Sequence, residues 1–88
     1  MENALLIREL EEAPYYELVE IFRFEVGRRY VYRLVAEREY FVHVVALREA
    51  TYVEFWHPSH AAPLLVFKVS DREELARVLL LLKSLVSR

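Results

Sequence analysis

The chain has 88 residues, 56% of them hydrophobic and 30% charged, with a formal net charge of −2 at pH 7. This length fits one domain, residues 1–88, and a domain of this size buries only roughly 60–65% of the surface that its unfolded chain exposes. Because the chain has no cysteine and three histidines, disulfides are excluded and a structural zinc core has too few ligands. We therefore expect no metal or cofactor, and we expect the domain to gain stability as a homodimer.

The sequence also bears on where the protein works. No apolar run approaches the ~18–20 residues of a membrane-spanning helix. The opening residues, MENALLIRELEE, are acidic and lack the basic segment that begins a signal peptide. Arginine greatly outnumbers lysine and glutamine is absent, which is typical of proteins from hot environments. These features predict a cytoplasmic protein without a membrane partner.

Two helices are predicted at the start of the chain. Apolar residues follow helical spacing from 2 to 13, and Pro14 interrupts them. Pro14 also suits the first turn of a second helix, whose apolar stripe would be Tyr15, Leu18, Val19 and Phe22. The end of this helix is ambiguous, because FRFEV at 22–26 alternates like a strand and Gly27 fits either a helix C-terminus or a hairpin turn.

After Gly27 the hydrophobic period changes to two. Four segments of strand length, rich in Val, Tyr and Phe, follow: Arg28–Ala36, Tyr40–Leu47, Thr51–His57 and Leu64–Val69. The short charged connections between the first three permit only antiparallel neighbours. Ser70 and Glu73 form a capping-box pattern that opens a last helix ending near Val86. The pattern predicts an α+β fold, a four-stranded antiparallel meander sheet with two N-terminal helices and one C-terminal helix.

The C-terminal helix has a broad apolar surface. The side that the sheet can cover carries Leu75, Val78, Leu79, Leu82 and Val86. Beyond a normal apolar stripe of about 100° lie Leu80, Leu81 and Leu85. The extra apolar flank fits self-association, and it fits equally a helix buried between the sheet and the N-terminal helices.

The alternation separates the predicted sheet into two faces. One face has no charged residue, so we expect helices to cover it; it holds Tyr30, Tyr32, Leu34, Tyr40, Val42, Val44, Ala46, Val53, Phe55, Leu65, Phe67 and Val69. The other face has all the charges and the only tryptophan; it holds Arg29, Val31, Arg33, Val35, Phe41, His43, Val45, Leu47, Tyr52, Glu54, Trp56, Leu64, Val66 and Lys68.

Aromatic and basic side chains alternate on this second face, while Ser, Asn, Asp and Gln are missing from it. A flat aromatic floor with cations at its margin suits an unpaired strand, because each base stacked on a ring contributes ~1–3 kcal/mol. The floor would be Phe41, Tyr52 and Trp56. Phosphate contacts would come from Arg28, Arg29, Arg33, His43, His57 and Lys68. The pattern thus fits a single-stranded nucleic acid, DNA or RNA, as partner.

The same pattern also fits a subunit interface. In an obligate homodimer, a face with Trp56 and several valines would meet its copy, with Arg33 and Glu54 paired across it. Aromatic residues and arginine are enriched in such interfaces as well. The alternative is therefore a homodimeric interaction or regulatory module without nucleic acid, and the alternation leaves both open.

Catalytic chemistry has little support. His57 and His60 are three residues apart, but Pro58 prevents a regular helix there and no third ligand converges. Ser59 lacks an orienting acid at a persuasive position. A single glycine excludes a glycine-rich phosphate loop. We expect no enzymatic activity, no catalytic residue and no metal.

Several short strings together resemble a known family: PYYELV, VGRRYVY, YFVHVV, FWHPSHAAP and KVSDREELARVLLLL. Across residues 14–86 the chain resembles the ThermoDBP-related single-stranded DNA-binding proteins of thermophilic archaea. The resemblance implies binding without strong sequence preference, in a cleft whose apolar floor receives bases and whose basic rim receives phosphates.

Carried onto this chain, the resemblance implies a rim of Arg28, Arg29 and Arg33. It implies a floor drawn from Tyr30, Tyr32, Phe41, Tyr52, Phe55 and Trp56. Three of these rings, Tyr30, Tyr32 and Phe55, belong to the helix-covered face. They would contact bases only if the cleft lies between helices and sheet, so both placements of the cleft stay open.

Overall fold

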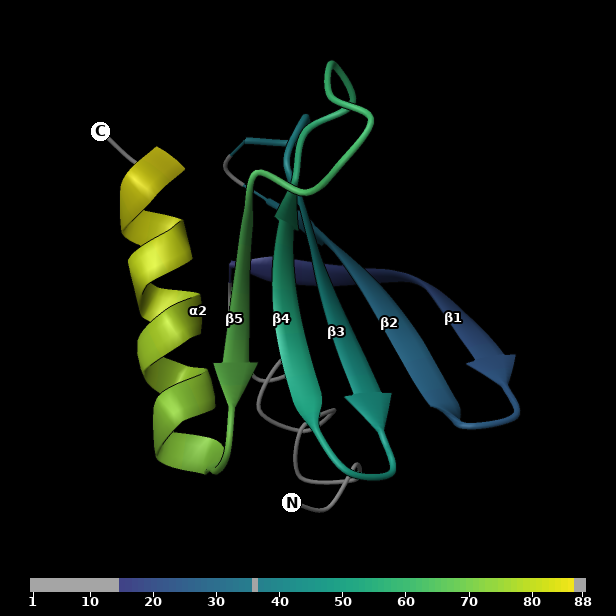
Figure 1. Cartoon of the computed structure of the whole chain (residues 1–88). Coiled ribbons are helices and arrows are strands. Elements are labelled where there is room, and N and C mark those ends of the chain that lie inside the picture. Colours follow the sequence, from purple (N-terminus) through teal and green to yellow (C-terminus); the bar gives the residue numbers. More distant parts are fainter. Residues whose placement is uncertain (1–14, 36, 87–88) are drawn as a thin grey trace.

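The computed structural model describes residues 15–35 and 37–86, which form one antiparallel sheet followed by a helix (Figure 1). The strands pair in chain order as a five-stranded meander. The elements are β1 (Tyr16–Phe24), β2 (Gly27–Leu34), β3 (Phe41–Leu47), β4 (Thr51–Trp56), β5 (Leu65–Val69) and α2 (Arg72–Val86).

The predicted four-stranded sheet with two N-terminal helices is wrong. The segment expected to form the second helix is strand β1, so the sheet has five strands. All four residues of the expected helical stripe are 38–47% exposed: Tyr15, Leu18, Val19 and Phe22. The inward residues of the strand are instead Tyr16 and Ile21. The first predicted helix, over 2–12, lies outside the described residues.

A bulge at Val19 interrupts the strand pattern of this segment. Leu18 pairs with Tyr32, but the next pair along the ladder is Glu20 with Val31, so one residue of β1 has no partner. A bulge of this kind shifts the alternation of the strand by one residue. The alternation that identifies a strand is therefore broken within β1. The helical spacing came from a different set, the exposed apolar residues of the segment. The hydrogen-bonded pairing with β2 selects a strand instead of a helix for this segment.

The later elements agree with the prediction to within two residues at each boundary. The two-face division is also confirmed, since the core is built from the charge-free face. Tyr30, Tyr32, Val42 and Val53 are at most 1% exposed. From α2, the residues that complete this core are Leu75, Leu79 and Leu82.

The start of α2 is capped one residue later than the sequence pattern predicts. The Oδ1 atom of Asp71, not the Ser70 hydroxyl, accepts the hydrogen bond from the amide of Glu74 at 2.9 Å. The Glu74 carboxylate in turn accepts from the amide of Ser70 at 2.6 Å. The reciprocal logic of a capping box is kept, with Asp71 at the cap and Glu74 as its acidic partner.

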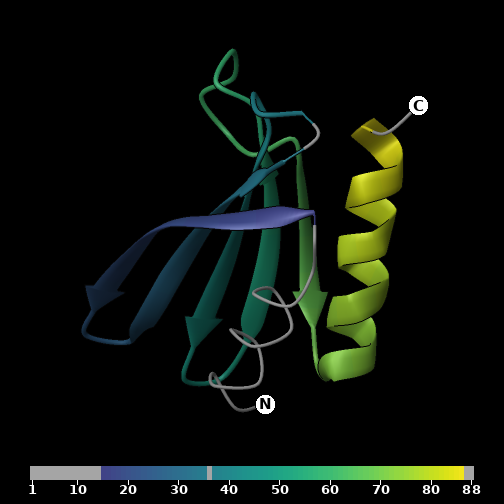
Figure 2. The same ribbon diagram turned by 180° about the vertical axis from the view of Figure 1, so that it is seen from behind.

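The twist of the sheet brings the two ends of the described chain together. The start of β1 passes behind the other strands in Figure 1, and in front of them in the reverse view of Figure 2, and it ends on the side of the sheet near α2. There the Tyr16 hydroxyl donates a hydrogen bond to the carbonyl of Leu79 at 2.7 Å. Burial raises the pKa of Tyr16, which keeps the phenol protonated as a donor. The Nζ atom of Lys83 lies 4.4 Å from the centre of the Tyr15 ring. These contacts close the core between the sheet and α2.

Removing the Tyr16 hydroxyl should loosen this closure. We expect Tyr16→Phe to lower the free energy of unfolding by about 1–2 kcal/mol, because a buried hydrogen bond is lost while the ring stays. Tyr15→Phe is the matched control, and should change stability by less than about 0.5 kcal/mol because Tyr15 is an exposed residue. Urea denaturation measures both. Equal effects of the two substitutions would contradict the role assigned to Tyr16.

Gly27 closes the two-residue hairpin turn between β1 and β2, so the hairpin alternative is confirmed and the helix C-terminus is wrong. It is the first residue of β2, and no glycine has a positive φ. A Cβ atom there would collide with the backbone carbonyl oxygen of Ala46 on β3 and lie 3.0 Å from the Cα of Leu47. Glycine is needed because the backbones of β2 and β3 approach closely at the end of the ladder.

We expect Gly27→Ala to lower the free energy of unfolding by about 1–3 kcal/mol, the usual effect of overpacking. Glu25→Ala, an exposed position in the adjacent turn, is the control and should leave stability nearly unchanged. Thermal unfolding followed by circular dichroism compares the two. An unchanged melting temperature in Gly27→Ala would show that β3 moves aside without loss.

Candidate nucleic-acid interface

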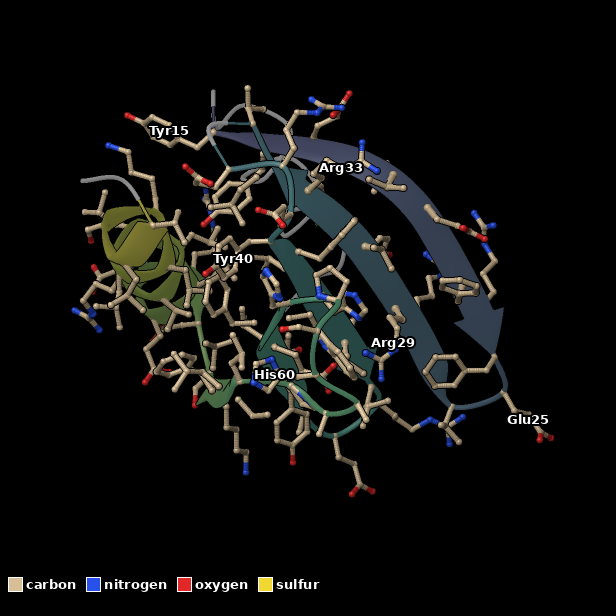
Figure 3. All side chains as sticks on the ribbon, turned by 90° about the horizontal axis from the view of Figure 1, so that it is seen from above. Tyr15, Glu25, Arg29, Arg33, Tyr40 and His60 are labelled. Atoms are coloured by element: carbon tan, nitrogen blue, oxygen red, sulfur yellow. The ribbon has the colours of Figure 1, made fainter. Side chains whose placement is uncertain are left out.

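The side of the sheet that faces away from α2 is the open face. Figure 3 looks down on the sheet, with Tyr40 beside α2 and Arg29 away from the helix. Strand pairing sets Phe41 opposite Trp56 and His43 opposite Glu54. The open face carries these partly buried side chains together with Arg29, Arg33, Tyr52 and Lys68, and β1 adds Glu20 and Phe22.

Glu54 is the centre of the polar contacts on the open face. Its Oε1 atom accepts hydrogen bonds from Arg29 at 2.5 Å and from the indole nitrogen of Trp56 at 2.9 Å. The Glu54 side chain is only 15% exposed, so its charge is stabilised chiefly by these two donors. Within the chain, Glu54 pairs with Arg29; its expected pairing with Arg33 across a dimer stays a prediction.

His43 completes the network as a neutral side chain. Arg29 also donates to its Nδ1 atom at 3.0 Å, and its ring stacks on Trp56 with centroids 5.1 Å apart. Burial, and next the positive charge of Arg29, lower the pKa of His43 to about 4, against a smaller opposing effect of Glu54. His43 therefore supplies no positive charge to a phosphate at neutral pH, contrary to its expected role.

The six expected stacking rings do not come together. Phe41, Tyr52 and Trp56 lie partly buried on the open face. The other three are core residues with at most 4% of their surface exposed: Tyr30, Tyr32 and Phe55. Two further open-face rings, Phe22 and Phe24 of β1, were missed because their segment was expected to be helical. Phe22 is 47% exposed.

The expected phosphate-binding residues are also divided between the faces. Arg33 lies on the open face, with its guanidinium carbon 5.3 Å from the centre of the Phe41 ring. Lys68 is opposite Tyr52 on the edge strand β5. Arg28 is on the other face, where it approaches the Tyr30 hydroxyl at 3.4 Å. His57 follows β4, and its Nε2 atom is 3.8 Å from Glu39.

The open face is less basic than the sequence suggests. Its strands carry three basic side chains, Arg29, Arg33 and Lys68. They also carry three acidic side chains, Glu17, Glu20 and Glu54. Because Arg29 is bound to Glu54, the cations left for a phosphate in these strands are Arg33 and Lys68.

A concavity of about 320 Å³ lies on the open face beside Trp56. Its lining combines rings and apolar side chains with one carboxylate: Glu20, Phe22, Val31, Phe41, His43, Trp56, His57, Pro58 and His60. One wall comes from β1 and the other from the loop after β4. The alternation of FRFEV at 22–26 was the one sequence signal that could have placed Phe22 here.

The loop histidines are engaged in a local turn. The Nδ1 atom of His57 accepts from the amide of Ser59 at 3.1 Å, and the Ser59 hydroxyl lies 2.9 Å from Nδ1 of His60. Among residues 15–35 and 37–86, no group of three or more His, Cys, Asp or Glu side chains could hold a metal ion. This geometry explains the loop histidines as turn-stabilising residues.

Comparison with known proteins finds no matching family model, curated protein or solved structure. The resemblance to ThermoDBP-related proteins stays a prediction. In the part of the chain that the structure describes, no helix is long and apolar enough to cross a membrane.

The buried neutral His43 should make stability depend on pH. Its pKa is about 4 in the folded protein and 6.5 ordinarily, so between these values the unfolded chain binds more protons. Stability should therefore fall as the pH is lowered from about 6.5 to 4, by up to about 3 kcal/mol. His43→Gln, which keeps an acceptor for Arg29, should lose this part of the pH dependence.

His60→Gln is the control, since His60 is exposed, and it should retain the wild-type dependence. Urea denaturation at half-unit pH steps measures all three proteins. Parallel curves for wild type and His43→Gln would contradict a neutral, buried His43.

Proposed function

We propose that the open face binds single-stranded DNA, with unpaired bases stacking at Trp56 and its aromatic neighbours. The observation that carries the proposal is the position of Trp56. It lines the concavity, while its N–H bond to Glu54 and its stacking on His43 fix its orientation. A ring that is already held in place loses little freedom when a base stacks on it, so more of the stacking energy appears as affinity.

Rings from three strands extend this platform. Phe22, Phe41 and Trp56 line one concavity, and Arg33 lies beside Phe41. An arginine beside a ring can contact a phosphate and can itself stack on a base. Successive bases therefore find both kinds of contact along the open face, whatever their sequence.

The balance of charge limits how much the backbone contributes. With Arg33 and Lys68 as the strand-borne cations not paired to Glu54, about two phosphates are neutralised. The slope of log affinity against log salt should then be shallow, near −1.4. Binding rests more on rings than on charge, which favours unpaired strands because a duplex hides the faces of its bases. Single-stranded RNA offers the same rings and phosphates, and is the natural second ligand to test.

A second candidate function is the homodimeric interaction module. It is favoured by apolar residues exposed along the β5 side of the open face, where Val66 is 54% and Leu64 is 38% exposed. In that case a second copy, not a nucleic acid, covers the rings.

Trp56→Ala should weaken binding of a 12-nucleotide oligo-dT by about 5- to 150-fold, the equivalent of one lost stacking contact of ~1–3 kcal/mol. Trp56→Phe should retain most of the affinity because a ring remains. Fluorescence anisotropy of an end-labelled oligonucleotide measures affinity in all three proteins, over a range of salt, and oligo-U gives the comparison with RNA.

The control for this experiment is Leu81→Ala, which removes an exposed apolar side chain of α2, on the other side of the sheet from the open face. It should bind like wild type. If wild type binds no oligonucleotide and elutes as a dimer that Val66→Glu dissociates, the interaction module replaces the nucleic-acid proposal.

A further inference from the structure

Glu20 is the carboxylate at the wall of the concavity. It stands on β1 opposite Val31, and it lines the same space as Phe41 and Trp56. The other two acids of the open-face strands have cationic partners: Glu54 binds Arg29, and Glu17 lies 3.5 Å from Arg38. Glu20 forms no ion pair with any described residue. The concavity thus combines a ring floor with an uncompensated negative charge.

A free carboxylate is unfavourable beside a phosphate backbone, because like charges repel. It becomes favourable when it accepts hydrogen bonds from the edge of a base. Unpaired bases are read in this way, by stacking and by hydrogen bonds to their Watson–Crick edges. A carboxylate offers two acceptor oxygens and no donor, so it selects bases by the donors that they present.

Guanine is the base that matches two acceptors. Its Watson–Crick edge presents the N1–H and the N2 amino group side by side. Adenine, cytosine and thymine each present a single donor group on that edge, next to an acceptor that would face the carboxylate. Two parallel charge-assisted hydrogen bonds are stronger and more directional than one.

The sheet provides the required span. Glu20 is on β1 and Phe41 is on β3, two strands away, and neighbouring strands are about 4.8 Å apart. A purine resting on the Phe41 and Trp56 side of the floor can therefore reach the Glu20 side chain, which extends from the opposite wall.

We propose that this concavity selects one guanine base, stacked on the floor formed by Phe41 and Trp56, through two hydrogen bonds to the Glu20 carboxylate. The proposal rests on the proposed binding of single-stranded DNA and adds a base preference to it. A single guanine in an oligo-dT strand should raise affinity about tenfold, as a bidentate contact does in base recognition.

The test uses end-labelled 12-nucleotide strands of dT with one central position changed to dG, dA, dC or deoxyinosine. Fluorescence anisotropy gives each affinity for the full chain. We expect the dG strand to bind about tenfold tighter than the dT, dA and dC strands. Deoxyinosine lacks the amino group at C2 and keeps N1–H, so it should fall between dG and the others.

Two variants assign the preference to one side chain. Glu20→Gln should lose the preference for dG, while Glu17→Gln, on the same strand and face, should keep it. Thermal unfolding checks that both variants fold like wild type. The discrimination ratio within each protein is the readout, because a general change in charge alters all affinities together.

The outcomes separate the two proposals. Equal binding of all five strands by wild type would overturn the guanine preference and leave the binding function intact. So would a Glu20→Gln variant that binds every strand more tightly but keeps the wild-type ratio, since Glu20 would then act only by repulsion. Failure of every strand to bind would overturn both.

Discussion

The open face depends on one carboxylate that serves three strands. Glu54 of β4 accepts hydrogen bonds from Arg29 of β2 and from the Trp56 indole, and Arg29 also binds His43 of β3. Removing Glu54 would leave Trp56 and Arg29 without their shared acceptor, so the ring and the guanidinium would lose their orientation together. A partly buried pair of this kind adds little net stability, because desolvation offsets much of the attraction. The pair instead helps to select one arrangement of side chains, in which the Trp56 ring has a fixed orientation on the candidate interface.

The face of the sheet opposite the open face forms the hydrophobic core, so the open face can stay exposed although part of it is apolar. The core needs a cover, and α2 supplies it with Leu75, Leu79 and Leu82. The twist of the sheet then brings Tyr16 of β1 onto the Leu79 carbonyl. First strand and last helix are therefore joined by a buried hydrogen bond, and the interior is closed without contributions from the open face. Rings on the open face are thus free of a role in the core.

The sequence predicts β2 to β5 well because their alternation is uninterrupted and every charge except that of Arg28 falls on one parity. It fails at β1, where the bulge at Val19 breaks the alternation and where exposed apolar residues follow helical spacing. The sequence also could not show which arginine of β2 pairs with Glu54. Arg29 and Arg33 stand at equal distances along β2 from Val31, which lies in the same row as Glu54, and only side-chain geometry selects Arg29. Glu20 and Phe22 were missed as site residues because their segment was expected to be a helix and not a strand of this sheet.

Charge balance finally bears on what this surface can recognise. A duplex presents mainly phosphates and hides its base faces, so a sheet that binds it must be strongly basic. Here the acids of the open-face strands equal the bases in number, and Arg29 is tied to Glu54. The attraction for a duplex backbone is accordingly weak. An unpaired strand offers ring faces and base edges as well, and these are the groups that Trp56, Phe41 and Glu20 can contact. The same acids that weaken general attraction to phosphate therefore favour ligands whose bases are accessible.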